Sequence, residues 1–178
     1  MRASLAFLAA LFMSAGNAAS AAGHRAVVEK ITVPTDAVSA WRLWTTNEGF
    51  QSFFPGGEAL ETNIELRPGG PYQVFIIKDA PAGSRGCDDC VILGYEEGRM
   101  ISFTWTNRPD MAVRPHKSHV TVNFEPIGAE TTHVTLVADG WGAGPDFDVA
   151  FAYFDEAWAS VISAFKARIE AGAAEGND

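Results

Sequence analysis

The sequence predicts an α+β fold in which a curved antiparallel sheet of seven strands wraps around a long C-terminal helix, and two short helices follow the first strand. Residues 145–172 keep the apolar spacing of a long amphipathic helix. From residue 58 onwards, apolar and polar residues alternate with period two, and turn residues separate the segments as in an antiparallel meander. Before this alternation begins, residues 25–54 contain one β-branched segment and then aromatic residues at helical spacing.

The long helix is predicted from Pro145 to Gly172. Gly144-Pro145-Asp146 suits a helix start, because proline is tolerated in the first turn and acidic residues are favoured at that end of the helix dipole. Gly172 is a typical stop. The apolar stripe consists of Phe147, Phe151, Phe154, Trp158, Val161, Phe165 and Ile169. A helix with so many large apolar side chains on one face needs a broad apolar partner, which the sheet provides.

Two short helices are predicted between the first strand and the rest of the sheet. The strand covers residues 25–33 and ends at Pro34, and Thr35-Asp36 then resembles a helix N-cap and first turn. Asn47-Glu48-Gly49 is expected to interrupt the helical segment, and Pro55-Gly56-Gly57 to end it. Because both helices are short and aromatic, we expect them to close one end of the sheet.

The remaining strands are predicted from alternation and from turn residues. They cover residues 58–67, 72–77, 90–95, 100–106, 117–124 and 131–138, with long loops at 79–89 and 108–115. Alternation places one set of apolar side chains on a common face, and this face is the expected partner of the long helix. The set contains Ile101, Phe103, Trp105, Val120, Val122, Phe124, Val134, Leu136 and Ala138.

The N-terminus has the features of an export signal. Met1-Arg2 is positively charged, Ala3 to Ala15 is apolar, and Ala19-Ser20-Ala21 fits the small residues of a cleavage site. The sequence therefore predicts a signal peptide at 1–21, cleavage near Ala21, and one periplasmic or secreted domain at 22–178, without stable membrane insertion after cleavage. The alternative is an uncleaved N-terminal anchor.

Composition and charge limit the partners of this domain. The 178 residues are 47% hydrophobic, which is enough for a sizeable core, and the net charge is −9. Nucleic acids and anionic membranes attract basic surfaces, so neither is an expected partner. We interpret the acidity as a contribution to the solubility of an exported protein.

Cys87-Asp-Asp-Cys90 is the single cysteine pair, and in an exported protein it predicts a disulfide. A redox-active pair is the alternative, but the two aspartates would destabilise a thiolate and no helix follows. A zinc site is not expected, because no histidine lies nearby in the sequence and His116 and His119 should point to opposite faces of a strand. We expect the disulfide to stiffen a loop at a cavity rim.

Several short motifs resemble the START-like (SRPBCC) superfamily, and in particular the branch named after the activator of Hsp90 ATPase. They are Gly69-Gly70-Pro71-Tyr72, residues 94–99, Ile101-Ser102-Phe103-Thr104-Trp105, residues 118–122, residues 132–136 and Asp139-Gly140-Trp141. The resemblance covers about residues 25–171 and implies the helix-grip fold. It also implies a deep cavity between helix and sheet that holds a hydrophobic or amphipathic molecule.

The aromatic content supports such a cavity independently, because it exceeds what one sheet face requires. The pocket candidates are Trp41, Trp44, Phe50, Phe53, Phe54, Tyr72, Val74, Phe103, Trp105, Trp141, Phe151, Phe154 and Trp158. The alternative is that they form ordinary core, since aromatic residues at helical spacing usually do. The sequence contains no nucleophile, phosphate-loop or zinc-protease motif, so we expect no cofactor and no metal.

Three functions remain open. The first is an exported binder of a hydrophobic small molecule. The second is a cavity enzyme of the polyketide cyclase or hydrolase type, with Glu65, Arg67, Tyr72 and Arg108 as candidate polar groups near a mouth. The third is a protein-interaction module like the Hsp90 activator domain, which export disfavours because cytosolic Hsp90 and ATP are absent outside the inner membrane. Polar side chains converging inside the pocket would favour an enzyme over a binder.

Overall fold

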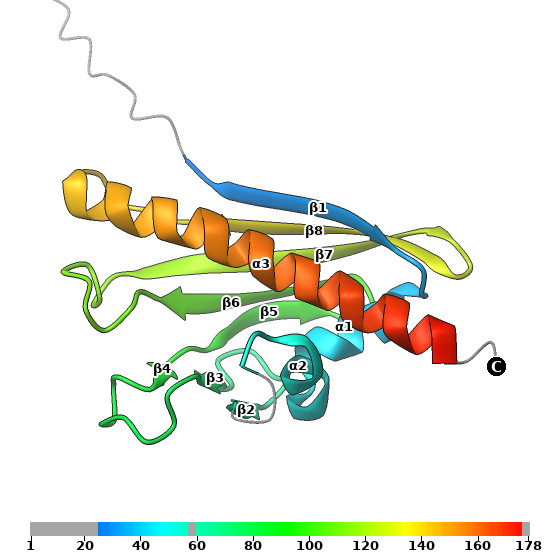
Figure 1. Cartoon of the computed structure of the whole chain (residues 1–178), viewed down its shortest axis with the longest axis horizontal. Coiled ribbons are helices and arrows are strands. Elements are labelled where there is room, and N and C mark those ends of the chain that lie inside the picture. Colours follow the sequence, from blue (N-terminus) through cyan, green and yellow to red (C-terminus); the bar gives the residue numbers. More distant parts are fainter. Residues whose placement is uncertain (1–24, 57–59, 176–178) are drawn as a thin grey trace, which may run out of the picture.

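The computed structural model describes residues 25–56 and 60–175, which form a long helix packed on an antiparallel sheet (Figure 1). The predicted signal peptide and its cleavage site lie outside the described residues, as do the first two positions of the strand predicted at 58–67. The elements are β1 (Val27–Val33), α1 (Ala37–Thr45), α2 (Asn47–Phe53), β2 (Glu61–Ile64), β3 (Tyr72–Phe75), β4 (Gly86–Cys87), β5 (Ile92–Glu96), β6 (Met100–Thr106), β7 (Lys117–Gly128), β8 (Thr131–Asp139) and α3 (Pro145–Glu175).

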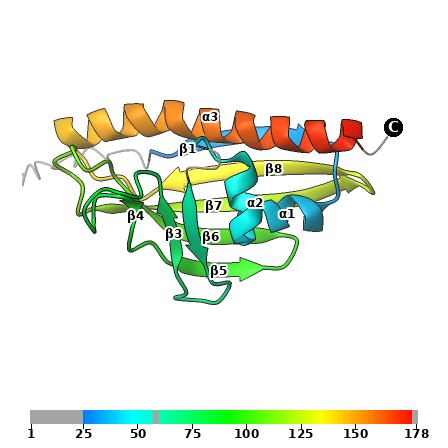
Figure 2. The same cartoon turned by 60° about the horizontal axis from the view of Figure 1, so that its bottom comes forward.

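The main sheet has the strand order β1-β8-β7-β6-β5, and every neighbouring pair is antiparallel. Figure 2 shows α3 lying along one face of this sheet. Ile101 is opposite Val122 in the β6–β7 ladder, and Val122 is opposite Leu136 in the β7–β8 ladder. All three side chains are fully buried. The predicted apolar face is therefore confirmed as the surface on which α3 packs.

The prediction of one seven-stranded sheet is wrong, because the strands divide into a five-stranded sheet and a second sheet with the order β2-β3-β4. The additional strand β4 is two residues long and lies inside the segment predicted as a loop, where so short a strand leaves no alternation to detect. A bridge between Pro71 and Val91 joins the two sheets at a corner. There the Gly69 amide donates to the Ile92 carbonyl at 2.8 Å.

Side-chain caps define where the two short helices begin. The Asp36 carboxylate accepts the Ser39 amide at 3.0 Å at the start of α1, as predicted. The Thr46 hydroxyl accepts the Gly49 amide at 3.1 Å and starts α2. Asn47-Glu48-Gly49 was predicted to interrupt the helices but forms the first turn of α2, because Thr46 satisfies one of its free amides.

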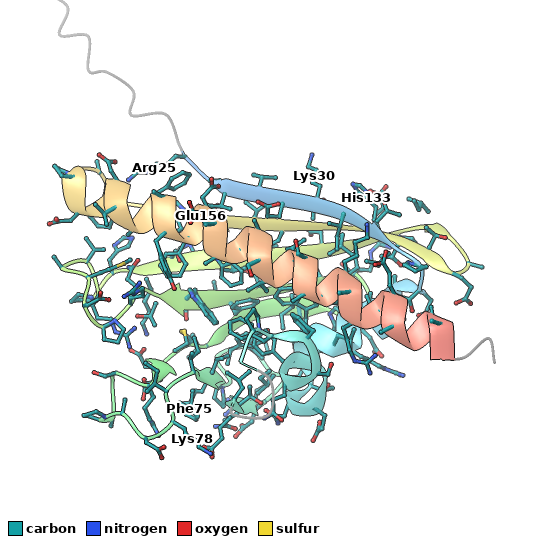
Figure 3. All side chains as sticks on the ribbon, viewed as in Figure 1. Arg25, Lys30, Phe75, Lys78, His133 and Glu156 are labelled. Atoms are coloured by element: carbon teal, nitrogen blue, oxygen red, sulfur yellow. A yellow bond between two sulfur atoms is a disulfide. The ribbon has the colours of Figure 1, made fainter. Side chains whose placement is uncertain are left out.

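Helix α3 begins at Pro145 as predicted and continues past Gly172 to Glu175. Its predicted stripe is buried from Phe154 to Ile169. The first two aromatic residues of the stripe are half-buried, since they meet the ends of the sheet rather than its centre. The Arg25 guanidinium lies 5.0 Å from the Phe151 ring centroid, and Figure 3 labels Arg25 beside the N-terminal half of α3. The His116 ring lies 4.9 Å from that of Phe147.

Trp44 occupies the centre of the aromatic core and is fully buried. Its ring centroid lies 5.1 Å from Phe53, 5.7 Å from Phe165 and 6.4 Å from Phe103. These contacts join α1, α2, α3 and β6. They hold the two short helices beneath the C-terminal half of α3, so that these helices close one end of the sheet as predicted (Figure 2).

Cys87 and Cys90 form a disulfide, and their Cα atoms are 5.3 Å apart, within the range for disulfides. Both residues are 1% exposed.

Within residues 25–56 and 60–175, no helix is sufficiently long and apolar to cross a membrane.

We predict that Phe165→Ala lowers the free energy of unfolding by about 3 to 5 kcal/mol, because it leaves a cavity beside Trp44. Val149→Ala is the control, since Val149 is 64% exposed on the same helix and its truncation should change stability by less than about 0.5 kcal/mol. Denaturant unfolding measures both. Equal effects of the two variants would contradict the assigned packing of α3.

We predict that replacing both cysteines by alanine lowers the free energy of unfolding by about 2 kcal/mol, the loop-closure value for a four-residue ring. The fold should persist, because the strands flanking Cys87 and Cys90 are held by their own ladder and bridge bonds. Denaturant unfolding and far-ultraviolet circular dichroism provide the measurements. Loss of the native spectrum in the double variant would show that the disulfide is required for folding.

Candidate ligand-binding site

A cavity of about 560 Å³ opens between α3 and the sheet. Its walls come from the N-terminal half of α3, the end of β6, and two loops at residues 76–86 and 106–114. The short helices fill the space beneath the C-terminal half of α3. Phe54, the C-cap of α2, lies at the boundary between this filled part and the cavity. The cavity is the part of the space between helix and sheet that α1 and α2 leave open.

The inner wall of the cavity is aromatic. Trp105 from β6 faces Trp158 from α3, with ring centroids 5.1 Å apart, and Phe54 lies 6.1 Å from Trp105. Phe154 and Val161 extend this wall along α3. All five side chains are at most 7% exposed, so the wall is rigidly packed from behind and presents apolar surface to the cavity.

Arg114 ties the two rim loops together. Its guanidinium donates to the carbonyls of Gly83 at 2.7 Å and Gly86 at 2.8 Å, and also to the carbonyl of Asn107. The Asn107 amide group donates in turn to the carbonyls of Val113 at 3.1 Å and His116 at 2.8 Å. These bonds hold both loops at the mouth of the cavity.

Gly86 has a backbone conformation that the rim requires. Its φ is +147°, and a Cβ atom at this position would lie 2.3 Å from the Val74 carbonyl oxygen. Any other residue would push β4 away from β3, because L side chains avoid this conformation and this close approach. Glycine therefore allows β4 to pair with β3 while its carbonyl faces Arg114.

Asp88 lies inside the four-residue disulfide ring and anchors the first rim loop. Its carboxylate accepts from Arg85 Nε at 2.6 Å and from the backbone amides of Gly83 at 3.1 Å and Arg85 at 2.9 Å. Burial alone would raise the pKa of the Asp88 carboxyl, but these hydrogen bonds and the Arg85 charge outweigh it and lower the pKa. Asp88 is therefore an ionised anchor at neutral pH.

The second rim loop carries a bidentate ion pair. Arg108 donates to both oxygens of Asp110, through Nε at 2.9 Å and Nη2 at 2.8 Å. The same guanidinium lies 5.0 Å from the centroid of the Tyr153 ring on α3. The contact places the second loop against the helix at the mouth.

Two buried polar atoms of lining residues have no hydrogen-bond partner among the described residues. They are Asn107 Oδ1 and Trp158 Nε1, and the two residues are 2% and 1% exposed. Most buried polar groups in native proteins are paired. These two atoms are therefore exceptions to the usual pairing of buried polar groups.

Four of the residues predicted as pocket candidates line the cavity: Phe54, Trp105, Phe154 and Trp158. The others lie elsewhere. Trp41, Trp44, Phe50, Phe53, Tyr72, Val74 and Phe103 are buried in the core, and Trp141 and Phe151 are half-buried beside Phe154. Of these, Phe103 packs on Trp105 with ring centroids 6.2 Å apart, and Trp141 packs on Phe154 at 5.6 Å, so both support the wall.

Of the polar residues considered near a mouth, Arg108 lines the cavity. Glu65 and Arg67 pair with each other at the surface. The Tyr72 hydroxyl donates to the Trp44 carbonyl at 2.9 Å, and complete burial raises its pKa. Within the described residues, no group of three or more His, Cys, Asp or Glu side chains could hold a metal ion.

Several lining residues were not predicted from the sequence. They are Ile76, Ile77, Ser84, Arg85, Gly86, Thr106, Asn107, Pro109, Asp110, Arg114, Tyr153, Ala157 and Val161. Arg85 and Arg114 lie in the two predicted long loops, where no periodicity assigns a direction to a side chain. Ile76 and Ile77 were predicted in a strand, but β3 ends at Phe75. The length of the two loops was the available signal, because long ordered loops in compact domains are commonly functional.

Solved structures with the same fold come from several bacteria. A protein from Mesorhizobium loti is 18% identical, with a TM-score of 0.60 over 82% of this chain and 97% of its own. One from Arthrobacter aurescens is 16% identical, with a TM-score of 0.61 over 82% of this chain and 86% of its own. DynU16, encoded in the dynemicin biosynthetic locus, is 19% identical, with a TM-score of 0.59 over 83% of this chain and 48% of its own.

At sequence identities below 20%, the similarity to these solved structures shows a shared fold and nothing more. No curated protein matches the sequence of this chain. The family model described as "Activator of Hsp90 ATPase homolog 1-like protein" matches residues 34–170, which include every element from α1 to β8 and most of α3. The chain therefore belongs to the activator of Hsp90 ATPase homolog 1-like family.

Proposed function

We propose that this protein is exported and binds a hydrophobic or amphipathic small molecule in the cavity between α3 and the sheet. The observation that carries the proposal is the buried aromatic wall formed by Phe54, Trp105 and Trp158 around a space of about 560 Å³. Ligand pockets are commonly of this size and are lined by apolar side chains with a few polar groups. Burial of apolar ligand surface there would contribute roughly 25 cal/mol per Å² before association costs.

The polar groups of the cavity favour a binder over a cavity enzyme. Asp110 is the one carboxylate among the lining residues, and both of its oxygens accept from Arg108. Arg114 and the amide group of Asn107 donate to loop carbonyls. These groups therefore build the rim, whereas an enzyme needs an acid or base directed at the substrate.

Export is supported by the N-terminal sequence and by the disulfide. The positive Met1-Arg2, the apolar Ala3 to Ala15 and the small residues at Ala19-Ser20-Ala21 together match a cleaved signal peptide. A disulfide between Cys87 and Cys90 persists most readily in an oxidising compartment. An exported protein would not meet cytosolic Hsp90, so ligand binding is the function that we propose for this family member.

We predict that the purified protein binds the neutral fluorescent probe N-phenyl-1-naphthylamine saturably and that Ala157→Phe weakens this binding at least about tenfold, since the added ring occupies the cavity. Ala157 lines the cavity on α3 and is half-buried. Ala150 on the same helix is not suitable for this change, because it is fully buried and does not line the cavity. Fluorescence titration gives the affinities, and native mass spectrometry of protein from its own host tests for a co-purified ligand.

Ala152→Phe is the matched control for this experiment, because Ala152 is exposed on the same helix. It should leave probe affinity within about twofold, the ordinary range for a surface change. Thermal unfolding of both variants checks that they fold. If the wild-type protein binds no probe and carries no ligand, the proposed binding function is wrong.

We predict that protein recovered from the periplasm or the medium begins near Ala22 and contains no free thiol when it is denatured without reductant. N-terminal sequencing and thiol counting measure these two properties. Cytoplasmic protein that retains Met1, or two free thiols in the recovered protein, would contradict export with an intact disulfide.

A further inference from the structure

The mouth of the cavity concentrates positive charge in an acidic protein. The chain has 22 acidic residues and 13 lysines and arginines, yet Arg85, Arg108 and Arg114 all line the cavity. The carboxylates that pair with them are Asp88 and Asp110. Three arginines and two aspartates leave one net positive charge beside an aromatic wall.

Two of these arginines already form hydrogen bonds through their terminal nitrogens with other groups of the protein. Arg108 forms its bidentate pair with Asp110 and is neutralised by it. Arg114 donates to three loop carbonyls, one at 2.7 Å from Gly83 and one at 2.8 Å from Gly86. Carbonyl groups carry no net charge, so Arg114 keeps its positive charge while both of its terminal nitrogens donate to the rim loops.

Arg85 differs, because part of its guanidinium is free. Its Nε donates to Asp88 Oδ1 at 2.6 Å, but its two terminal nitrogens have no acceptor among the described residues. The guanidinium lies 4.1 Å from the centroid of the Phe75 ring, and the side chain is 32% exposed. Figure 3 labels Phe75 near the second sheet, on the side away from β1 and β8.

Asp88 holds Arg85 in place, and its single negative charge is shared between Arg85 and Arg114. The same carboxylate accepts from Arg85 and from two backbone amides, and it also lies 4.0 Å from Arg114. One aspartate therefore serves two arginines. Arg85 is fixed on one edge by Asp88 and on one face by Phe75, and this leaves its two terminal nitrogens as preorganised donors for an anion.

We infer that the ligand is an anionic amphiphile, whose carboxylate or other oxyanion group binds Arg85 at the mouth while its apolar body lies against Trp105 and Trp158. The inference rests on the proposed binding function and adds the chemical class of the ligand. The cavity requires an apolar body because its inner wall is aromatic. The free edge of Arg85 selects a planar or tetrahedral oxyanion, because two parallel N–H groups match two oxygens. We assign the ligand to free amphiphiles rather than membrane lipids, since the cavity volume suits a drug-sized molecule.

The test uses two probes that differ by one charged group. 1-Anilinonaphthalene-8-sulfonate carries a sulfonate, whereas N-phenyl-1-naphthylamine has the same ring system without it. We expect the wild-type protein to bind the sulfonate probe more tightly, and Arg85→Gln to weaken that probe about tenfold or more, as expected for loss of a charge-assisted pair. Binding of the neutral probe should stay within about twofold, the range of a surface change.

Arg99→Gln is the matched control, because Arg99 is 70% exposed, pairs with Glu96 in the β5–β6 turn and does not line the cavity. It should change neither affinity. A salt titration of the wild-type protein tests the same point without a variant: raising NaCl from about 0.02 to about 0.5 M should weaken the sulfonate probe alone, because salt screens a partly exposed charge pair.

The outcomes separate this inference from the proposed function on which it rests. If both probes bind with equal affinity, equal salt dependence and equal response to Arg85→Gln, the binding function stands and the anionic class is wrong. If neither probe binds, both are wrong. Sedimentation of the protein with phosphatidylglycerol vesicles but not phosphatidylcholine vesicles, lost in Arg85→Gln, would assign the anion to a membrane lipid and overturn the assignment to a free amphiphile.

Discussion

The packing of Trp44 against Phe165 is the contact on which the rest of the structure depends. Trp44 belongs to α1, touches Phe53 of α2 and Phe103 of β6, and thereby fixes both short helices beneath the C-terminal half of α3. The Tyr72 ring stacks on Phe103 at 3.9 Å, which attaches the second sheet to the same cluster. Because the short helices fill one half of the space under α3, the other half is left to an aromatic wall and two rim loops, and the cavity forms there.

The division into two sheets gives this cavity its rim. A continuous seven-stranded sheet would carry its last strands directly past the end of β6. The corner at Pro71 and Val91 instead turns β3 and β4 outward, so that residues 76–86 approach the loop at 106–114. Arg114 bridges the two loops, and the disulfide ring holds Asp88 where it can anchor Arg85. The charged residues at the mouth thus act first as structural ties, and the free edge of Arg85 is what remains available for a ligand.

The elements with a clear period could be predicted from sequence, whereas the cavity lining could not. The step pattern from Phe147 to Ile169 fixed the buried face of α3, and alternation fixed the inward face of β6, β7 and β8. Phe103 and Trp105 have the same place in this alternation, yet Phe103 is packed in the core and Trp105 borders the cavity. The spacing of apolar residues predicts which side chains are buried. Whether a buried side chain is packed in the core or lines the cavity depends on where α1 and α2 end. Loop residues such as Arg85 and Arg114 have no period, and strand β4 is too short to show one.

The unpaired atoms Asn107 Oδ1 and Trp158 Nε1 depart from the usual pairing of buried polar groups. An unpaired buried polar group costs about 1 to 3 kcal/mol, and at Asn107 the two hydrogen bonds of the amide group to the Val113 and His116 carbonyls offset this cost. Two of the three such atoms among the described side chains belong to residues that line the cavity. The third, Trp44 Nε1, lies in the aromatic cluster where the ring area outweighs the loss of one hydrogen bond. Deviations from an optimal core concentrate at functional sites. Both residues border the space proposed for the ligand, beside the same wall that the aromatic core supports.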